Sequence, residues 1–215
     1  MAITVRPADA RDAPLLAQTA LLASRSHVTR GAWDLCFPTG DEECLANLQL
    51  FATANPPSFF HWSVCLVGEV DGTPAASLCV AAPGELPSFD PTPTIVGTLR
   101  TRGWSPEQLA GLDRRLAPFL TCVFGLPTDA LMIENVATLP ALRRRGAVGA
   151  LLEQALERGR RAGCRQAQLT ILIGNTAAQS AYERVGFRVV EEKRTAAFAA
   201  VVPGCAGLAL MQCPL

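Results

Sequence analysis

Apolar and polar positions alternate or recur at helical spacing along most of this chain, which predicts a mixed succession of strands and helices. In the first half, "AITVRPA" over 2–8 predicts a strand, and the spacing after Asp9 predicts a helix to about Ser26. Acidic residues followed by apolar positions at helical spacing predict a second helix over 41–55. Two apolar runs within 59–82, joined by the Asp-Gly turn of "VDGT", predict a β-hairpin.

The second half carries a sharper pattern of alternating strands and helices. The predicted elements are a strand over 130–140, a helix over 147–163, a strand over 166–173, a short helix between Asn175 and Gly186, and strands over 187–198 and 207–214. Apolar side chains of the longer helix fall on one stripe, at i, i+3, i+4 and i+7. One face of that helix is therefore expected to lie against a core.

Two stretches are less regular. Residues 31–40 are expected to be a loop that carries Trp33 and Phe37 as large apolar side chains. Residues 83–129 begin with several prolines and are expected to be a loop with one helix, over 105–120, which starts with a serine cap and a proline. We expect 83–129 to be an insertion between strands on the substrate side.

Composition limits the class of protein. The chain has 215 residues, 49% of them hydrophobic and 18% charged, which is typical of a globular protein and predicts one domain over 1–215. Its formal net charge is zero, which argues against a general nucleic-acid binder. We expect no secretory signal, because the N-terminal segment lacks a basic stretch followed by an apolar one, and no apolar run is long enough to span a membrane. We therefore expect a cytoplasmic protein without nucleic-acid or membrane partners.

The chain's eight cysteines occur singly, without a Cys-x-x-Cys pair, and Cys65 and Cys79 fall inside apolar runs. Buried reduced thiols are favoured over disulfides in such a chain. The two histidines, His27 and His61, show no ligand-like spacing to cysteines or acids, so no metal site is predicted.

Candidate chemistry begins where a strand and Pro140 lead into three arginines, Gly146 and a helix. The first N–H groups of a helix have no intrahelical partner, so they form an anion site, and glycine lets the anion approach the backbone closely. Arg143 and Arg145 are placed to add charge-assisted contacts to phosphate oxygens. Neither a GxxxxGK[ST] nor a GxGxxG pattern is present, and a solvated arginine-rich turn remains the alternative.

The order of these elements, with "VATLPALRRRGAVGALLEQAL", "GN" at 174–175 and "AYERVGF" at 181–187, resembles the GNAT superfamily of acyl-CoA-dependent acyltransferases. The resemblance is specific over about 130–190 and looser over 1–82. It implies an α+β fold with a central mixed, mostly antiparallel sheet of about seven strands flanked by helices. It also implies acetyl-CoA as co-substrate and an amine of a small molecule or peptide as acceptor.

The resemblance implies cofactor-binding residues in two places. The phosphate loop falls on Arg143, Arg144, Arg145, Gly146, Ala147 and Val148, followed by Gly149. Val148 departs from the family's usual Gly or Ala, and we expect its side chain to face the core. The strand positions Val136, Ala137 and Thr138 match the segment whose backbone binds pantetheine. Asn175 would bond the pantetheine arm, act as a helix N-cap, or do both.

The resemblance also makes Tyr182 a candidate general acid for the leaving CoA thiolate, because a phenol stays protonated at neutral pH. The alternative is a packed aromatic on a short helix. Glu134 is a candidate base if burial raises its pKa, and otherwise has a surface or salt-bridged role. His27 and His61 are further candidate bases, although an aromatic neighbourhood favours a packing role for His61.

On the acceptor side we expect His27, Trp33 and Phe37. A catalytically inactive acyl-CoA-binding regulatory module is the alternative function, and a nucleotide-binding domain of other chemistry is disfavoured by its missing fingerprints. Exposed apolar residues on the C-terminal strand would permit a homodimer.

Overall fold

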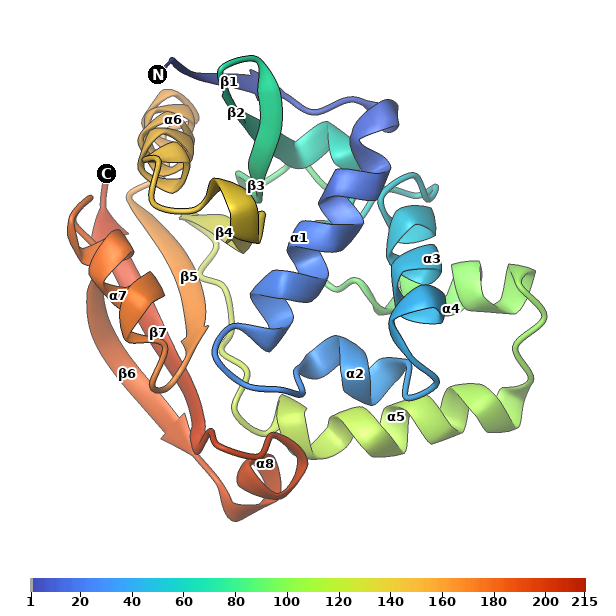
Figure 1. The fold of residues 1–215 in the computed structure, drawn as a ribbon. Helices are drawn as coiled ribbons and strands as arrows, with labels where there is room; N and C mark the ends of the chain where they lie inside the picture. Colours follow the sequence, from blue (N-terminus) through green and yellow to red (C-terminus); the bar gives the residue numbers. More distant parts are fainter. Residues whose placement is uncertain (1) are drawn as a thin grey trace.

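Seven strands form one mixed sheet in the computed structural model of the chain, which describes residues 2–215 (Figure 1). The strands are β1 Ile3–Pro7, β2 Cys65–Val70, β3 Thr73–Ala81, β4 Ala130–Thr138, β5 Gln166–Leu172, β6 Arg188–Arg194 and β7 Gly207–Pro214. Their order is β1-β2-β3-β4-β5-β7-β6, and every neighbouring pair is antiparallel except β4 and β5. The predicted mixed, mostly antiparallel sheet is confirmed.

The hairpin between β2 and β3 follows directly from its turn residues. Asp71 and Gly72 both have left-handed backbone angles, with φ of 49° and 77°. This geometry matches the twist of two antiparallel strands, and Asp-Gly adopts it readily. Val70 and Thr73 pair on either side of the turn, as the sequence predicted.

Helices cover both faces of the sheet. They are α1 Ala13–Arg25, α2 Ala32–Cys36, α3 Asp41–Phe51, α4 Thr92–Thr101, α5 Pro106–Leu120, α6 Ala147–Arg161, α7 Thr176–Glu183 and α8 Ala196–Val201, with 3-10 turns η1 Ala10–Asp12, η2 Trp62–Val64 and η3 Pro140–Leu142. The apolar stripe of α6 packs on one face of β1 to β4, whereas α1 packs on β3 and β4 (Figure 1). Leu66 and Leu78 face α6, and Cys65 and Cys79 face α1, as strand alternation requires.

A second, aromatic core lies among α1 to α5. Here the structure corrects the expected loop over 31–40, which contains α2. The Asp34 carboxylate accepts the Gly31 N–H at 2.8 Å and starts that helix. Trp33 and Phe37, four residues apart, stack with ring centroids 6.3 Å apart and are both buried. Burial of two aromatic rings, about 150–250 Å² each, explains why so short a segment is ordered.

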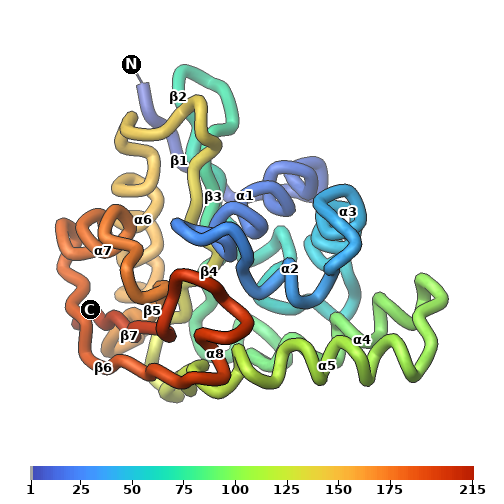
Figure 2. Tube along the Cα trace, turned by 60° about the horizontal axis from the view of Figure 1, so that its bottom comes forward, coloured from blue at the N-terminus to red at the C-terminus, as the bar shows by residue number. Residues whose placement is uncertain are grey.

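Residues 83–129 hold two helices, α4 and α5, where the sequence predicted one. Proline near the start of α4 is compatible with the first helical turn, so the local proline content concealed this helix. Leu99 anchors α4 in the aromatic core, where it is fully buried. Figure 2 shows the pair extending past α3, away from the strands.

Several expected boundaries also shift. The helix expected over 41–55 ends at Phe51, and the first strand of the expected hairpin begins only at Cys65, directly after the 3-10 turn η2. The strand expected over 187–198 ends at Arg194, because the Thr195 side chain caps α8.

The C-terminal strand does not expose the apolar side chains that would permit a homodimer. β7 lies between β5 and β6 and is largely buried, while β6 forms the sheet edge. The exposed apolar side chains near this end are Val189 and Val190, both on β6. A homodimer remains a prediction, and its most accessible apolar surface is β6.

All eight cysteines are buried free thiols, which confirms the expectation of reduced cysteines. Between residues 2 and 215, no helix has the length and apolar character needed to cross a membrane. The same residues contain no cluster of three or more histidine, cysteine and acidic side chains suited to a metal ion.

Candidate active site

The sheet opens between its two parallel strands. β4 and β5 pair only through residues 130–132 and 166–168 of the described chain, whereas β5 continues to pair with β7 along its whole length. The C-terminal half of β4 therefore has an edge that β5 does not cover. Figure 1 shows β5 curving away from β4 at this end.

The free edge exposes particular backbone groups. The Leu139 N–H donates to the Ala75 carbonyl on β3 at 2.8 Å. Because successive residues of a strand direct their backbone groups to opposite edges, those of Thr138 and Val136 point away from β3. The Arg143 Nε donates to the Thr138 carbonyl at 3.3 Å, which agrees with that direction. Val136 and Thr138 can thus bind an extended ligand laid along β4.

A bulge fixes the start of this edge. Across β3 and β4, Ser77 pairs with Ala137 but Cys79 pairs with Glu134, so β4 contains one extra residue. Asn135 absorbs it with a left-handed backbone, φ 56°. Asparagine tolerates this conformation better than most residues, and a bulge re-aims the side chains beside it. Glu134, just before the bulge, takes its direction from it.

The N-terminus of α6 lies beyond the open edge. η3 leads into the three arginines, and Gly146 is the N-cap residue with φ 87°. No side chain caps this helix, so its first N–H groups are left for solvent or a ligand. The left-handed backbone angle favours glycine at this position, and a Cβ on Gly146 would make a tight 3.1 Å contact with Ile3 Cδ1 on β1. This combination is suited to binding a phosphate.

Arg143, Arg144 and Arg145 are all exposed around this helix end, and Arg144 has a left-handed backbone with φ 62°. The guanidinium groups can reach an anion bound at the α6 N-terminus, where they would add to the positive end of the helix dipole.

Val148 packs against the main core, so its side chain leaves the anion site, as expected from its position on the apolar stripe of α6. Gly149 lies on the same first turn, and a Cβ placed there would meet no atom within 4 Å. Space for a ligand therefore remains beside Gly149 despite the valine.

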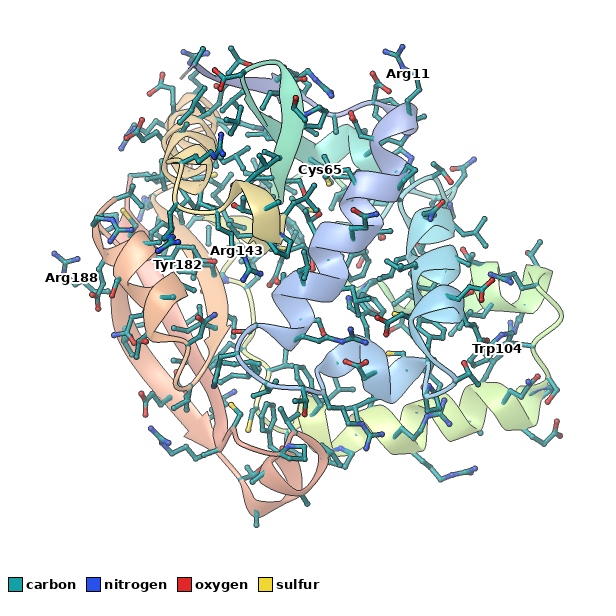
Figure 3. The ribbon with its side chains drawn as sticks, in the orientation of Figure 1. Arg11, Cys65, Trp104, Arg143, Tyr182 and Arg188 are labelled. Carbon is teal, nitrogen blue, oxygen red and sulfur yellow. The ribbon has the colours of Figure 1, made fainter. Side chains whose placement is uncertain are left out.

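Tyr182 lies on α7 and packs in the main core beside Phe187, with ring centroids 6.3 Å apart. Burial raises the pKa of the Tyr182 phenol above its usual value, and the nearby charge of Glu134 raises it further. The hydroxyl is therefore protonated at neutral pH. Figure 3 labels Tyr182 on α7 and Arg143 just beyond η3.

Glu134 is partly buried on β4, and desolvation raises its pKa to about 7. This value allows the carboxylate to accept and release a proton near neutrality. The charge of Glu134 also contributes to the raised pKa of Tyr182. Glu134 is thus a candidate base that titrates near neutrality, and Tyr182 is a candidate acid that stays protonated there.

Asn175 caps α7 through its side-chain oxygen, which accepts the Ala178 N–H at 3.1 Å. Its Nδ2 donates to no other residue in the described part of the chain and can donate to a ligand. His27 lies against the adjacent turn: its Nε2 is 3.0 Å from the position that a Cβ on Gly174 would occupy. The structure therefore places exposed His27 next to Asn175.

Three sequence candidates lie elsewhere. Trp33 and Phe37, expected to border the acceptor, are enclosed in the aromatic core with relative exposures of 6% and 2%. They face no open surface, so that expectation is corrected. His61 is the N-cap residue of η2, where its Nδ1 accepts the Ser63 N–H, and its ring lies 5.1 Å from that of Trp62.

Sequence reasoning missed two features next to the site. The left-handed Asn135 was signalled by a polar Glu-Asn pair inside an apolar strand. The second is a buried hydroxyl pair: Thr19 Oγ1 on α1 and Ser77 Oγ on β3 are 2.6 Å apart, and Ser77 pairs with Ala137 of β4. No local pattern connects residues so far apart in sequence.

Solved structures with a similar fold include two N-acetyltransferases and one protein in complex with CoA. An N-acetyltransferase from Staphylococcus aureus Mu50 is 17% identical with a TM-score of 0.65, and covers 99% of this chain and 100% of its own. A GCN5-related N-acetyltransferase from Kribbella flavida is 21% identical with a TM-score of 0.58 over 100% and 98% of the two chains. Rv2747 from Mycobacterium tuberculosis, in complex with CoA, is 14% identical with a TM-score of 0.52 over 99% of each chain.

At these identities the similarity establishes the fold alone. No curated protein sequence matches the chain. The sequence does match a family model, described as the acetyltransferase (GNAT) family, over residues 32–187, which include β2 to β5, α6 and Tyr182. The chain therefore belongs to the GNAT acetyltransferase family.

Proposed function

We propose that this protein transfers an acetyl group from acetyl-CoA to an amine of a small molecule or peptide, by direct attack within a ternary complex. The observation that carries the proposal is an uncapped α6 N-terminus next in sequence to a β4 edge that β5 leaves unpaired. The helix end suits the phosphates of acetyl-CoA, and the free strand edge, which carries Glu134, suits its extended arm and thioester.

The phosphate end of acetyl-CoA would bind at α6. Backbone N–H groups following Gly146 would hold the pyrophosphate, with Arg143, Arg144 and Arg145 adding charge. The open space beside Gly149 supports this placement, because the phosphate must approach the first turn closely. Ala147 and Val148 would contribute through their backbone N–H groups only.

The pantetheine arm would lie along β4. An extended arm can pair with the outward backbone groups of Val136 and Thr138, with Ala137 between them held against Ser77 of β3. Asn175 Nδ2 would hold the same arm from the other side. A β4 N–H directed at the thioester oxygen would stabilise the negative charge that develops there.

Proton transfer would use Glu134 as the base and Tyr182 as the acid. Glu134 accepts a proton from the attacking amine, directly or through water, while a C–N bond forms at the thioester carbon. The C–S bond then breaks, and Tyr182 donates its proton to the departing sulfur. Glu134 then releases its proton to solvent and Tyr182 regains one from solvent, which returns both groups to their starting states. His27 would border the amine on the α1 side.

The decisive experiment measures acetylated product by mass spectrometry when the protein is given acetyl-CoA and a panel of amines and short peptides. We expect at least one amine to be acetylated, and turnover to fall on replacement of Glu134 by Gln. CoA binding without product for any acceptor, unchanged by that replacement, would instead identify an inactive acyl-CoA-binding module.

A further inference from the structure

Two thiols face each other on the sheet, on the α1 side and outside the acetyl-transfer path. Cys65 on β2 and Cys79 on β3 are direct partners in the antiparallel register, and their Sγ atoms are 2.7 Å apart. Both side chains are buried, with exposures of 1% and 4%. Neither thiol has a role in the proposed reaction.

The backbone geometry favours a covalent link between them. The Cys65 N–H donates to the Trp62 carbonyl and the Cys65 carbonyl accepts the Ala8 N–H at 3.0 Å, so neither group bonds to Cys79. The two cysteines therefore form a non-hydrogen-bonded pair. Such pairs bring Cα atoms to about 4.5 Å and side chains closest together, within the Cα separation that a disulfide spans.

Different hydrogen bonds give the two sulfurs different roles. Asn135 Nδ2 donates to Cys79 Sγ at 3.8 Å, so this sulfur accepts a hydrogen bond from outside the pair. Cys65 Sγ instead donates to the His61 carbonyl at 3.3 Å. Burial and the adjacent thiol raise the pKa of Cys65 well above its ordinary value. Cys79 is the better nucleophile, and Cys65 is the proton-bearing partner.

We propose that Cys65 and Cys79 are a reversible dithiol–disulfide couple that a small peroxide oxidises. The Cys79 thiolate attacks one oxygen of hydrogen peroxide, the O–O bond breaks, and a sulfenic acid and hydroxide form. Cys65 sulfur then attacks the sulfenic sulfur, the S–O bond breaks and the S–S bond forms. In total, two thiols lose two electrons and two protons, and one peroxide becomes two waters. A dithiol reductant reverses the step.

Oxidation of the two thiols would alter the proposed active site, and this part of the inference rests on the proposed function. Cys79 also pairs with Glu134 of β4, and Asn135 holds the bulge that aims Glu134. Bond formation draws Cys79 Sγ toward β2, away from the already long contact with Asn135 Nδ2. The oxidised protein is therefore expected to turn over more slowly until it is reduced.

The test treats the folded protein with hydrogen peroxide, blocks free thiols under denaturing conditions, and maps the peptides by mass spectrometry. We expect a Cys65–Cys79 cross-linked peptide lacking two hydrogen atoms, which dithiothreitol removes. The matched control Cys164→Ser, at a buried cysteine elsewhere, should still form it. Cys65→Ser, or Cys65→Ala if the serine variant fails to fold, should leave Cys79 as an oxyacid without a cross-link.

If both cysteines are still fully alkylated after peroxide treatment, or if they are cross-linked to other cysteines, the proposed Cys65–Cys79 couple is wrong. Turnover measured before oxidation, after it and after reduction tests the coupling to the site. A cross-link that leaves turnover unchanged would overturn that coupling alone. Absence of turnover in every state would count against the proposed acetyl transfer, while the cross-link result would stand independently.

Discussion

Glu134, the proposed base, makes the stability of this protein depend on pH. Burial raises its pKa from 4.5 to about 7, so the unfolded chain ionises at lower pH than the folded one. Between these values the folded state binds more protons, and the free energy of unfolding falls as pH rises. This loss of stability is absent below the pKa of Glu134 in the unfolded chain. It is complete above pH 7, where it amounts to at most about 3 kcal/mol.

Glu134→Gln should therefore be more stable than the wild type at pH 8 and equal to it near pH 4, because the amide carries no charge at either pH. Acetyl transfer by the variant should be slower, since the base is lost. Denaturant unfolding of both proteins across this pH range measures the difference. A stability difference independent of pH would show that Glu134 ionises normally in the folded protein.

Tyr182→Phe removes the hydroxyl group, which is the proposed proton donor, and keeps the packed ring. The ring contacts with Phe187 remain, so we expect the variant to fold and to bind acetyl-CoA as the wild type does. Turnover should fall about 100-fold, because no acid protonates the leaving thiolate. Steady-state kinetics together with a binding titration checks this, and unchanged kcat would remove Tyr182 as the acid.

At the scale of elements, the two ends of α6 offer a matched comparison of charge. Arg143→Ala/Arg145→Ala removes two positive charges at the end proposed to bind the anion. Arg160→Ala/Arg161→Ala removes two at the other end, where both arginines pair with Glu157. Only the first variant should lose CoA affinity, about tenfold or more, and should weaken the dependence of affinity on salt. Equal CoA affinities of the two double variants in calorimetric titrations would show that Arg143 and Arg145 belong to a solvated turn that does not bind CoA.

Two helix glycines test packing at the same scale. A Cβ on Gly97 of α4 meets no atom, so Gly97→Ala should stabilise the protein by about 0.5–1 kcal/mol through helix propensity. A Cβ on Gly159 of α6 would lie 2.6 Å from Leu215 Cδ1 and 2.9 Å from Leu131 Cδ2. Gly159→Ala should destabilise by about 1–3 kcal/mol, because overpacking outweighs the same propensity gain. Urea unfolding midpoints of the two variants should move in opposite directions.

Across the whole molecule, sequence patterns predicted the features that depend on residues close together along the chain. The Asp-Gly hairpin, the striped α6 and the Asn175 cap were all recognisable because each depends on residues a few positions apart. The short α2, α4 and α8 were missed, since tertiary burial such as that of Leu99 stabilises them. The β4–β5 opening and the bulge at Asn135 depend on strand pairing over long distances, and so does the burial that raises the pKa of Glu134.

The whole fold also reports ligand binding through its thermal stability. A ligand that binds only the folded state raises the free energy of unfolding, by about 2.7 kcal/mol at 100 times its Kd. Acetyl-CoA should therefore raise the Tm, whereas NAD and ATP at the same concentration should not. Tyr182→Phe should show the full acetyl-CoA shift, and Arg143→Ala/Arg145→Ala a reduced one. A larger shift with NAD or ATP than with acetyl-CoA would overturn the proposed ligand, because the site along β4 and α6 would then recognise a different phosphate compound.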